Sequence, residues 1–183
     1  MKNLIKRNLD GKRILFLFIL TSILYALMLT ITIPKVMNYS SGMKLLDMIP
    51  TGYSPAYVNL LFTSLGELGR DAYLFKQIPV DMIYPLMFAI SYSLILAFFL
   101  KKLGKLDGIF FYVCYIPLFS GLFDYFENIG IITMLNAYPN NSNLLAQTTN
   151  IFSLFKSVCT TFTFIILIAF LIILGLRNLK SIR

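Results

Sequence analysis

Residues 121–130, Gly-Leu-Phe-Asp-Tyr-Phe-Glu-Asn-Ile-Gly, place two carboxylates and an amide inside a run that is otherwise apolar enough to lie in a membrane. Asp124, Glu127 and Asn128 are spaced i, i+3 and i+4, so a helix presents all three on one face. Ionisable side chains within a membrane span are costly and usually face the interior of a helix bundle. The stretch therefore predicts a membrane-embedded helix whose polar face the rest of the chain must cover.

The composition of the whole chain is that of an integral membrane protein. Of its 183 residues, 58% are hydrophobic and only 13% are charged, whereas a soluble domain carries roughly 25% charged residues. Four long apolar runs predict membrane spans over about 14–33, 79–100, 108–135 and 154–176. We expect one transmembrane domain over residues 1–183, an all-α four-helix bundle. A re-entrant or interfacial helical segment, 44–78, is expected between the first two spans.

The basic residues predict the orientation of this bundle. They cluster before the first run, between the second and third runs, and after the last, and these clusters hold 11 of the 16 Lys and Arg residues. The cluster members are Lys2, Lys6, Arg7, Lys12, Arg13, Lys101, Lys102, Lys105, Arg177, Lys180 and Arg183. The positive-inside rule assigns all three clusters to the cytoplasm, which predicts a multi-pass protein of a bacterial plasma membrane with both termini inside. Such juxtamembrane charges indicate no nucleic-acid partner.

The connection between the first two spans has helical signals of its own. Pro55, with Ser54 as the N-cap, predicts a helix over 55–65 that is too short to cross a bilayer. Glu67, Arg70 and Asp71 follow with i, i+3 and i+4 spacing. Arg70 can pair with Glu67, or the charges can stay solvated on an exposed loop. This segment either re-enters the membrane partway or lies in its interface.

The predicted topology brings the unusual polar residues to the outer half of the membrane or just above it. Five carboxylates against three cations favour a cation, a proton or an amine in a pocket there. Lys156 can snorkel to the surface, or it can turn inward to Asp124 or Glu127. Pro85 frees the carbonyl of Asp81 from the helix. The candidate ligand-binding residues are Glu67, Arg70, Asp71, Tyr73, Asp81, Tyr84, Asp124, Glu127, Asn128 and Lys156.

Three interpretations of these residues remain open. The chain has no histidine, which excludes His-based zinc sites and Ser-His catalysis within it, and the sequence requires no metal or cofactor. The charges can pair internally in a structural subunit that has a membrane-protein partner. They can bind or transport a small cationic or amphiphilic ligand, which is our leading hypothesis. Paired carboxylates can also serve a membrane-embedded enzyme that acts on a lipid-soluble substrate.

Four motifs together resemble a group of bacterial four-span membrane proteins of unknown function. They are Gly-Glu-x-Gly-Arg-Asp-x-Tyr at 66–73, Asp-x-x-Tyr-Pro at 81–85, Phe-Asp-x-x-Glu-Asn at 123–128, and a lysine in the last span, Lys156. The likeness extends over most of the chain from the outer connection onward. It implies a shared four-span fold and no particular reaction.

Overall fold

The computed structural model describes residues 2–181 and is helical throughout. Helices make up 83% of it, and the described residues contain no strand. Four helical segments in this part of the chain are long and apolar enough to cross a membrane: Gly11–Met37, Pro55–Lys102, Ile109–Ala137 and Asn143–Arg177. The predicted all-helical class and the four apolar helices are thus confirmed. Arg183 of the predicted basic tail lies outside the described residues, as does the side chain of Lys180.

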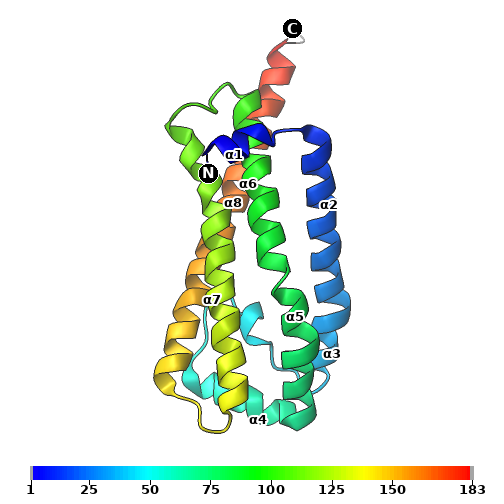
Figure 1. Ribbon diagram of the computed structural model, residues 1–183, viewed down its shortest axis with the longest axis vertical. Helices are drawn as coiled ribbons and strands as arrows, with labels where there is room; N and C mark the ends of the chain where they lie inside the picture. Colours follow the sequence, from blue (N-terminus) through cyan, green and yellow to red (C-terminus); the bar gives the residue numbers. More distant parts are fainter. Residues whose placement is uncertain (1, 182–183) are drawn as a thin grey trace.

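The helices form an elongated bundle with distinct ends (Figure 1). Both termini and the α6–α7 loop lie at one end, here called the terminal end, whereas α4 runs across the opposite end, here called the far end. In chain order the elements are α1 (Lys2–Arg7), α2 (Gly11–Leu27), η1 (Met28–Thr32), α3 (Ile33–Met37), η2 (Leu46–Met48), α4 (Pro55–Ala72), η3 (Tyr73–Gln77), α5 (Ile78–Asp81), α6 (Tyr84–Lys102), η4 (Ile109–Tyr115), α7 (Ile116–Ala137) and α8 (Asn143–Ser181).

Two prolines are each preceded by a wide π-helical turn. Pro34 and Pro79 are the second residues of α3 and α5, and they follow η1 and η3. A proline has no N–H to donate, and the residue before each one bonds five residues back: Ile33 to the Met28 carbonyl and Ile78 to the Tyr73 carbonyl. The first helical segment therefore continues to Met37, beyond the expected end at residue 33, because the π turn accommodates the proline.

Other boundaries also differ from the expected spans. The second span is divided at Met82 and Ile83, just before Pro85, into α5 and α6. The fourth begins at Asn143 instead of 154, because α8 continues through the polar residues before the apolar run. Ser54 does cap α4, since its side chain accepts a hydrogen bond from the Tyr57 N–H. The helix then runs to Ala72 through a kink at Gly66, where φ is +61°.

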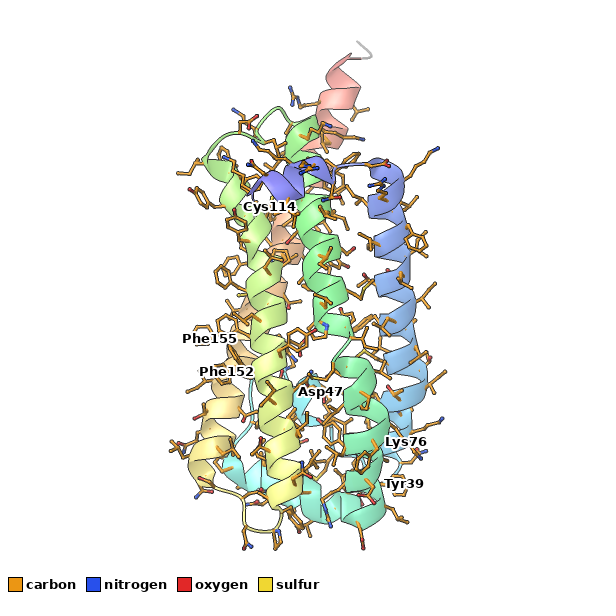
Figure 2. The ribbon with its side chains drawn as sticks, viewed as in Figure 1. Tyr39, Asp47, Lys76, Cys114, Phe152 and Phe155 are labelled. Atoms are coloured by element: carbon orange, nitrogen blue, oxygen red, sulfur yellow. The ribbon has the colours of Figure 1, made fainter. Side chains whose placement is uncertain are left out.

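The segment between α3 and α4 folds back into the bundle. Leu45 and Leu46 are completely buried, and Figure 2 shows Asp47 between α7 and α5, well inside the far end marked by Tyr39 and Lys76. The Tyr53 N–H is held by the Asn150 side chain of α8 at 2.7 Å. This segment, residues 38–54, is called the inserted segment below.

The bundle has two apolar cores with a polar layer between them. The far-end core includes Ile78 and Ile131, and the terminal-end core includes Leu94 and Cys114. Asp124 lies between the two cores along α7, and Asp81 lies at the edge of the far-end core, next to Ile78 and Tyr84. The chain thus concentrates its buried charges at the level where the apolar packing is interrupted.

Candidate functional site

A cavity of about 490 Å³ occupies this polar layer. Its wall includes three carboxylates, Asp47, Asp81 and Asp124, and one ammonium, Lys156. The remaining wall is made of hydroxyl, aromatic and aliphatic side chains from α2, η1, α3, α6, α7, α8 and the inserted segment, among them Thr21, Tyr25, Tyr84, Phe88, Ser120 and Thr160. The cavity therefore combines a strongly charged side with an apolar and aromatic one.

Two glycines on α7 bring the neighbouring helices close enough to build the site. A Cβ on Gly121 would lie 2.7 Å from the Pro85 carbonyl oxygen, and one on Gly130 would lie 2.1 Å from the Thr149 hydroxyl. The antiparallel pairing of α7 with α8 is continued by a hydrogen bond of 2.7 Å between the Ser120 and Thr160 hydroxyls. Along α8, Lys156 lies between Thr149 and Thr160, which face Gly130 and Ser120 of α7. This position places Lys156 level with the carboxylates of α7.

Lys156 turns inward and binds both predicted carboxylates of α7. Its Nζ lies 3.4 Å from Asp124 Oδ1 and makes a closer ion pair with Glu127 Oε2. The side chains of Lys156 and Asp124 are 14% and 10% exposed, and that of Glu127 is fully buried. Of the two alternatives for Lys156, snorkelling and inward pairing, the structure shows the second. Glu127 lies behind the ammonium and does not reach the cavity wall.

Asp81 differs from these two carboxylates because its side chain is unpaired. Its freed carbonyl, expected from Pro85, accepts a hydrogen bond of 3.3 Å from the Asn128 amide. Within residues 2–181, however, no hydrogen bond or ion pair engages its carboxylate. Asp81 is only 4% exposed and lines the cavity. A buried charge without a partner is costly, so this carboxylate requires a proton or a cation from outside the described structure.

Asp47 is a site residue that the sequence analysis missed. Its Oδ1 accepts a hydrogen bond of 2.7 Å from the Tyr73 hydroxyl, and its Oδ2 lies 3.5 Å from the Gln77 amide nitrogen. Both partners belong to the π turn η3, and Gln77 also bonds Thr32 of the other π turn. The available signal was one acid inside the apolar run Leu-Leu-Asp-Met-Ile at 45–49. Only the fold-back of the inserted segment brings it to the other carboxylates.

Tyr53, in the same inserted segment, adds a buried hydroxyl near the network. Burial, and secondarily the charge of Glu127, raise the pKa of Tyr53, so the phenol stays neutral at physiological pH. Its hydroxyl has no hydrogen-bond partner among the described residues, and the same is true of Glu127 Oε1 and Asn128 Oδ1. The region behind Lys156 thus retains unsatisfied polar atoms.

The predicted residues of α4 lie away from the cavity. Glu67 and Asp71 are exposed. Arg70 donates to the Phe62 carbonyl at 2.9 Å and stacks over the Tyr138 ring at 4.3 Å, and it makes no ion pair with Glu67 in the described structure. Tyr84 lines the cavity directly. The structure therefore brings Tyr73, Asp81, Tyr84, Asp124, Glu127, Asn128 and Lys156 together and leaves Glu67, Arg70 and Asp71 outside.

The charges of the site do not balance. Four carboxylates, Asp47, Asp81, Asp124 and Glu127, surround the single ammonium of Lys156. A site of this sign attracts a cation or retains protons. Among the described residues no group of three or more acidic, cysteine or histidine side chains is arranged to hold a metal ion. The arrangement suits a ligand that contributes positive charge and hydrogen-bond donors.

Comparison of the chain with protein-family models, with curated proteins and with solved structures finds no match. The resemblance to bacterial four-span proteins therefore stays a prediction.

Proposed function

We propose that this chain is a multi-pass membrane protein that binds, or transports, a small cationic or amphiphilic ligand in the polar cavity. In this proposal the four apolar helices span a bacterial plasma membrane, both termini are cytoplasmic, and the cavity lies toward the outer face. The inserted segment and α4 then form the re-entrant or interfacial part expected from the sequence.

The observation that carries the proposal is the unpaired carboxylate of Asp81 on the cavity wall. Lys156 already forms ion pairs with Asp124 and Glu127, which supports a structural role for these two residues. Asp81 has no such partner in the described structure, and nearby aromatic rings, including those of Tyr84 and Phe88, can stabilise a cationic group. The ligand contact is therefore assigned to Asp81, with Asp124 and Asp47 adding negative potential.

Thermal unfolding of the detergent-solubilised protein tests this assignment. We expect n-octylamine to stabilise the protein, whereas octanoate and 1-octanol, matched in chain length, do not. Ligand at about 100 times its Kd would add roughly 2.7 kcal/mol. Asp81→Asn should fold and lose this effect, and the matched control Asp71→Asn, at an exposed carboxylate outside the cavity, should keep it. Equal stabilisation by all three probes would contradict cation binding, and an unchanged response of Asp81→Asn would contradict the role of Asp81.

A further inference from the structure

The bundle is asymmetric around the cavity because α2 packs mainly on one other long helix, α6. Among the described helices, α2 makes its extensive contacts with α6, while α8 makes its own with α7 and α6, and α2 and α8 share no comparable interface. The α2–α6 contact includes the stacked rings of Tyr25 and Tyr84, whose centroids are 5.4 Å apart. The bundle thus has one pair of cavity-lining helices that are not packed together.

The cavity wall is built from both of these unpacked helices. Ser22 and Tyr25 contribute from α2, and Thr161 and Phe164 contribute from α8. All four side chains are exposed, Tyr25 by 47% and Phe164 by 39%. A side chain that lines a cavity and is also exposed lies at its rim. The cavity therefore opens sideways between α2 and α8.

The two ends of the cavity are covered by other parts of the chain. Toward the far end lies the inserted segment, whose Met48 lines the cavity while Asp47 is held by Tyr73. Toward the terminal end, the rings of Phe88, Tyr92 and Phe164 pack together, with centroids 4.5 Å apart for Phe88–Tyr92 and 5.3 Å apart for Tyr92–Phe164. The opening between α2 and α8 is thus the route that neither cover obstructs.

The surroundings of this opening are apolar. Exposed aliphatic and aromatic side chains adjoin the rim residues, including Leu29 of η1, one turn beyond Tyr25, and Phe162 and Ile165 of α8. At a rise of about 1.5 Å per residue, Tyr25 lies roughly 21 Å along the helix from Gly11, which is inside a hydrocarbon core of about 30 Å. In a membrane the rim would therefore contact acyl chains, while Asp81 lies on the charged side of the cavity.

On the basis of the proposed function, we infer that the ligand is a membrane-dissolved amphiphile that enters laterally between α2 and α8. Its protonated amine head binds Asp81, and its apolar chain passes the Tyr25 rim into the bilayer. The hydroxyls of Ser22 and Thr161 at the rim and the Ser120–Thr160 pair within the wall provide hydrogen-bonding groups along the path of the head. A fully aqueous cation would require no opening toward lipid.

The absence of tryptophan from the chain makes a fluorescence test direct. Tyr25→Trp places a single tryptophan at the rim. Ile23→Trp is its depth-matched control, because two residues of helix turn a side chain by about 200° and Ile23 is 59% exposed without lining the cavity. Each variant is reconstituted in phosphatidylcholine vesicles and titrated with ω-bromododecylamine, whose terminal bromine quenches tryptophan on contact.

We expect saturable quenching of Tyr25→Trp that is lost when Asp81→Asn is added, and only non-saturable background quenching of Ile23→Trp. If octylamine still stabilises the protein through Asp81 but both tryptophans are quenched alike, lateral entry is overturned and the proposed function stands. If there is neither Asp81-dependent stabilisation nor saturable quenching, both proposals fail.

Discussion

At the scale of single residues, the buried charges divide into compensated and uncompensated groups. Lys156 satisfies Asp124 and Glu127 across the α7–α8 contact, whereas the Asp81 carboxylate has no partner in the described structure. We therefore propose different roles for side chains of the same type in one layer: the first two hold helices together, and the third is available to a ligand. This division makes different predictions for substitutions on either side of the cavity.

Lys156→Met should destabilise the protein by about 3–5 kcal/mol, because it leaves two buried carboxylates without their cation. The triple variant Lys156→Met, Asp124→Asn, Glu127→Gln should recover much of that loss, since the two α7 positions then carry no charge that needs the lysine. Equilibrium unfolding in mixed micelles measures both, with Lys76→Met, at an exposed lysine, as the control. If the single and triple variants are equally unstable, the loss comes from the missing ion pairs and not from carboxylates left buried without a cation.

The hydrogen bond between Tyr73 and Asp47 anchors the inserted segment. Tyr73→Phe should cost about 1.5–3 kcal/mol, the range for hydrogen bonds to charged groups, and should increase proteolysis within 43–51. Tyr57→Phe is the matched control, because it removes a bond of 2.8 Å from the Tyr57 hydroxyl to the Lys44 carbonyl in an exposed setting. Unchanged protease resistance in Tyr73→Phe would argue that apolar burial alone holds the segment.

Sequence spacing predicted shared faces correctly but not the direction in which each face points. Asp124, Glu127 and Asn128 are all buried, as their spacing within an apolar run indicated. Glu67, Arg70 and Asp71 have the same spacing, yet Glu67 and Asp71 are exposed because α4 lies across the far end and not inside the bundle. Spacing fixes which side chains neighbour one another on a helix, whereas tertiary packing decides which face is covered.

At the scale of helices, the apolar runs predicted the four long segments because hydrophobic length is a local property. Their breaks were harder to predict. Pro34 and Pro79 could have ended helices, but π turns carry the chain through both, and the choice depends on contacts such as Thr32 with Gln77. The fold-back of residues 38–54 is non-local in the same way, since its buried leucines pack on helices distant in sequence.

Close approach of α6 and α7 gives a prediction at this scale. Gly121→Ala should destabilise the protein by about 1–3 kcal/mol, the usual cost of overpacking, because the new Cβ meets the Pro85 backbone, which cannot move aside like a side chain. Gly175→Ala in α8 has nothing within 4 Å of its Cβ and should be neutral or stabilising by up to about 1 kcal/mol. Thermal unfolding distinguishes them, and a neutral Gly121→Ala would show that the two helices are not in tight contact.

At the scale of the whole molecule, charge distribution and architecture agree. The α6–α7 loop carries Lys101, Lys102 and Lys105 and lies at the same end of the bundle as both termini (Figure 1). The α7–α8 connection at the far end, residues 136–143, contains no lysine or arginine. By the positive-inside rule, the orientation we propose has the terminal end in the cytoplasm and α4, the inserted segment and the cavity toward the outer face.

Cysteine labelling tests this orientation. In a background with Cys114 and Cys159 replaced by alanine, Asn140→Cys and Lys105→Cys introduce single thiols at exposed positions in the loops at opposite ends. A membrane-impermeant maleimide applied to intact bacterial cells should label Asn140→Cys and should reach Lys105→Cys only after the membrane is permeabilised. The opposite pattern would reverse the bundle and place the cavity on the cytoplasmic side. Labelling of both thiols in intact cells would mean that these helices do not separate two compartments, because four crossings keep the two loops on opposite sides of the bilayer.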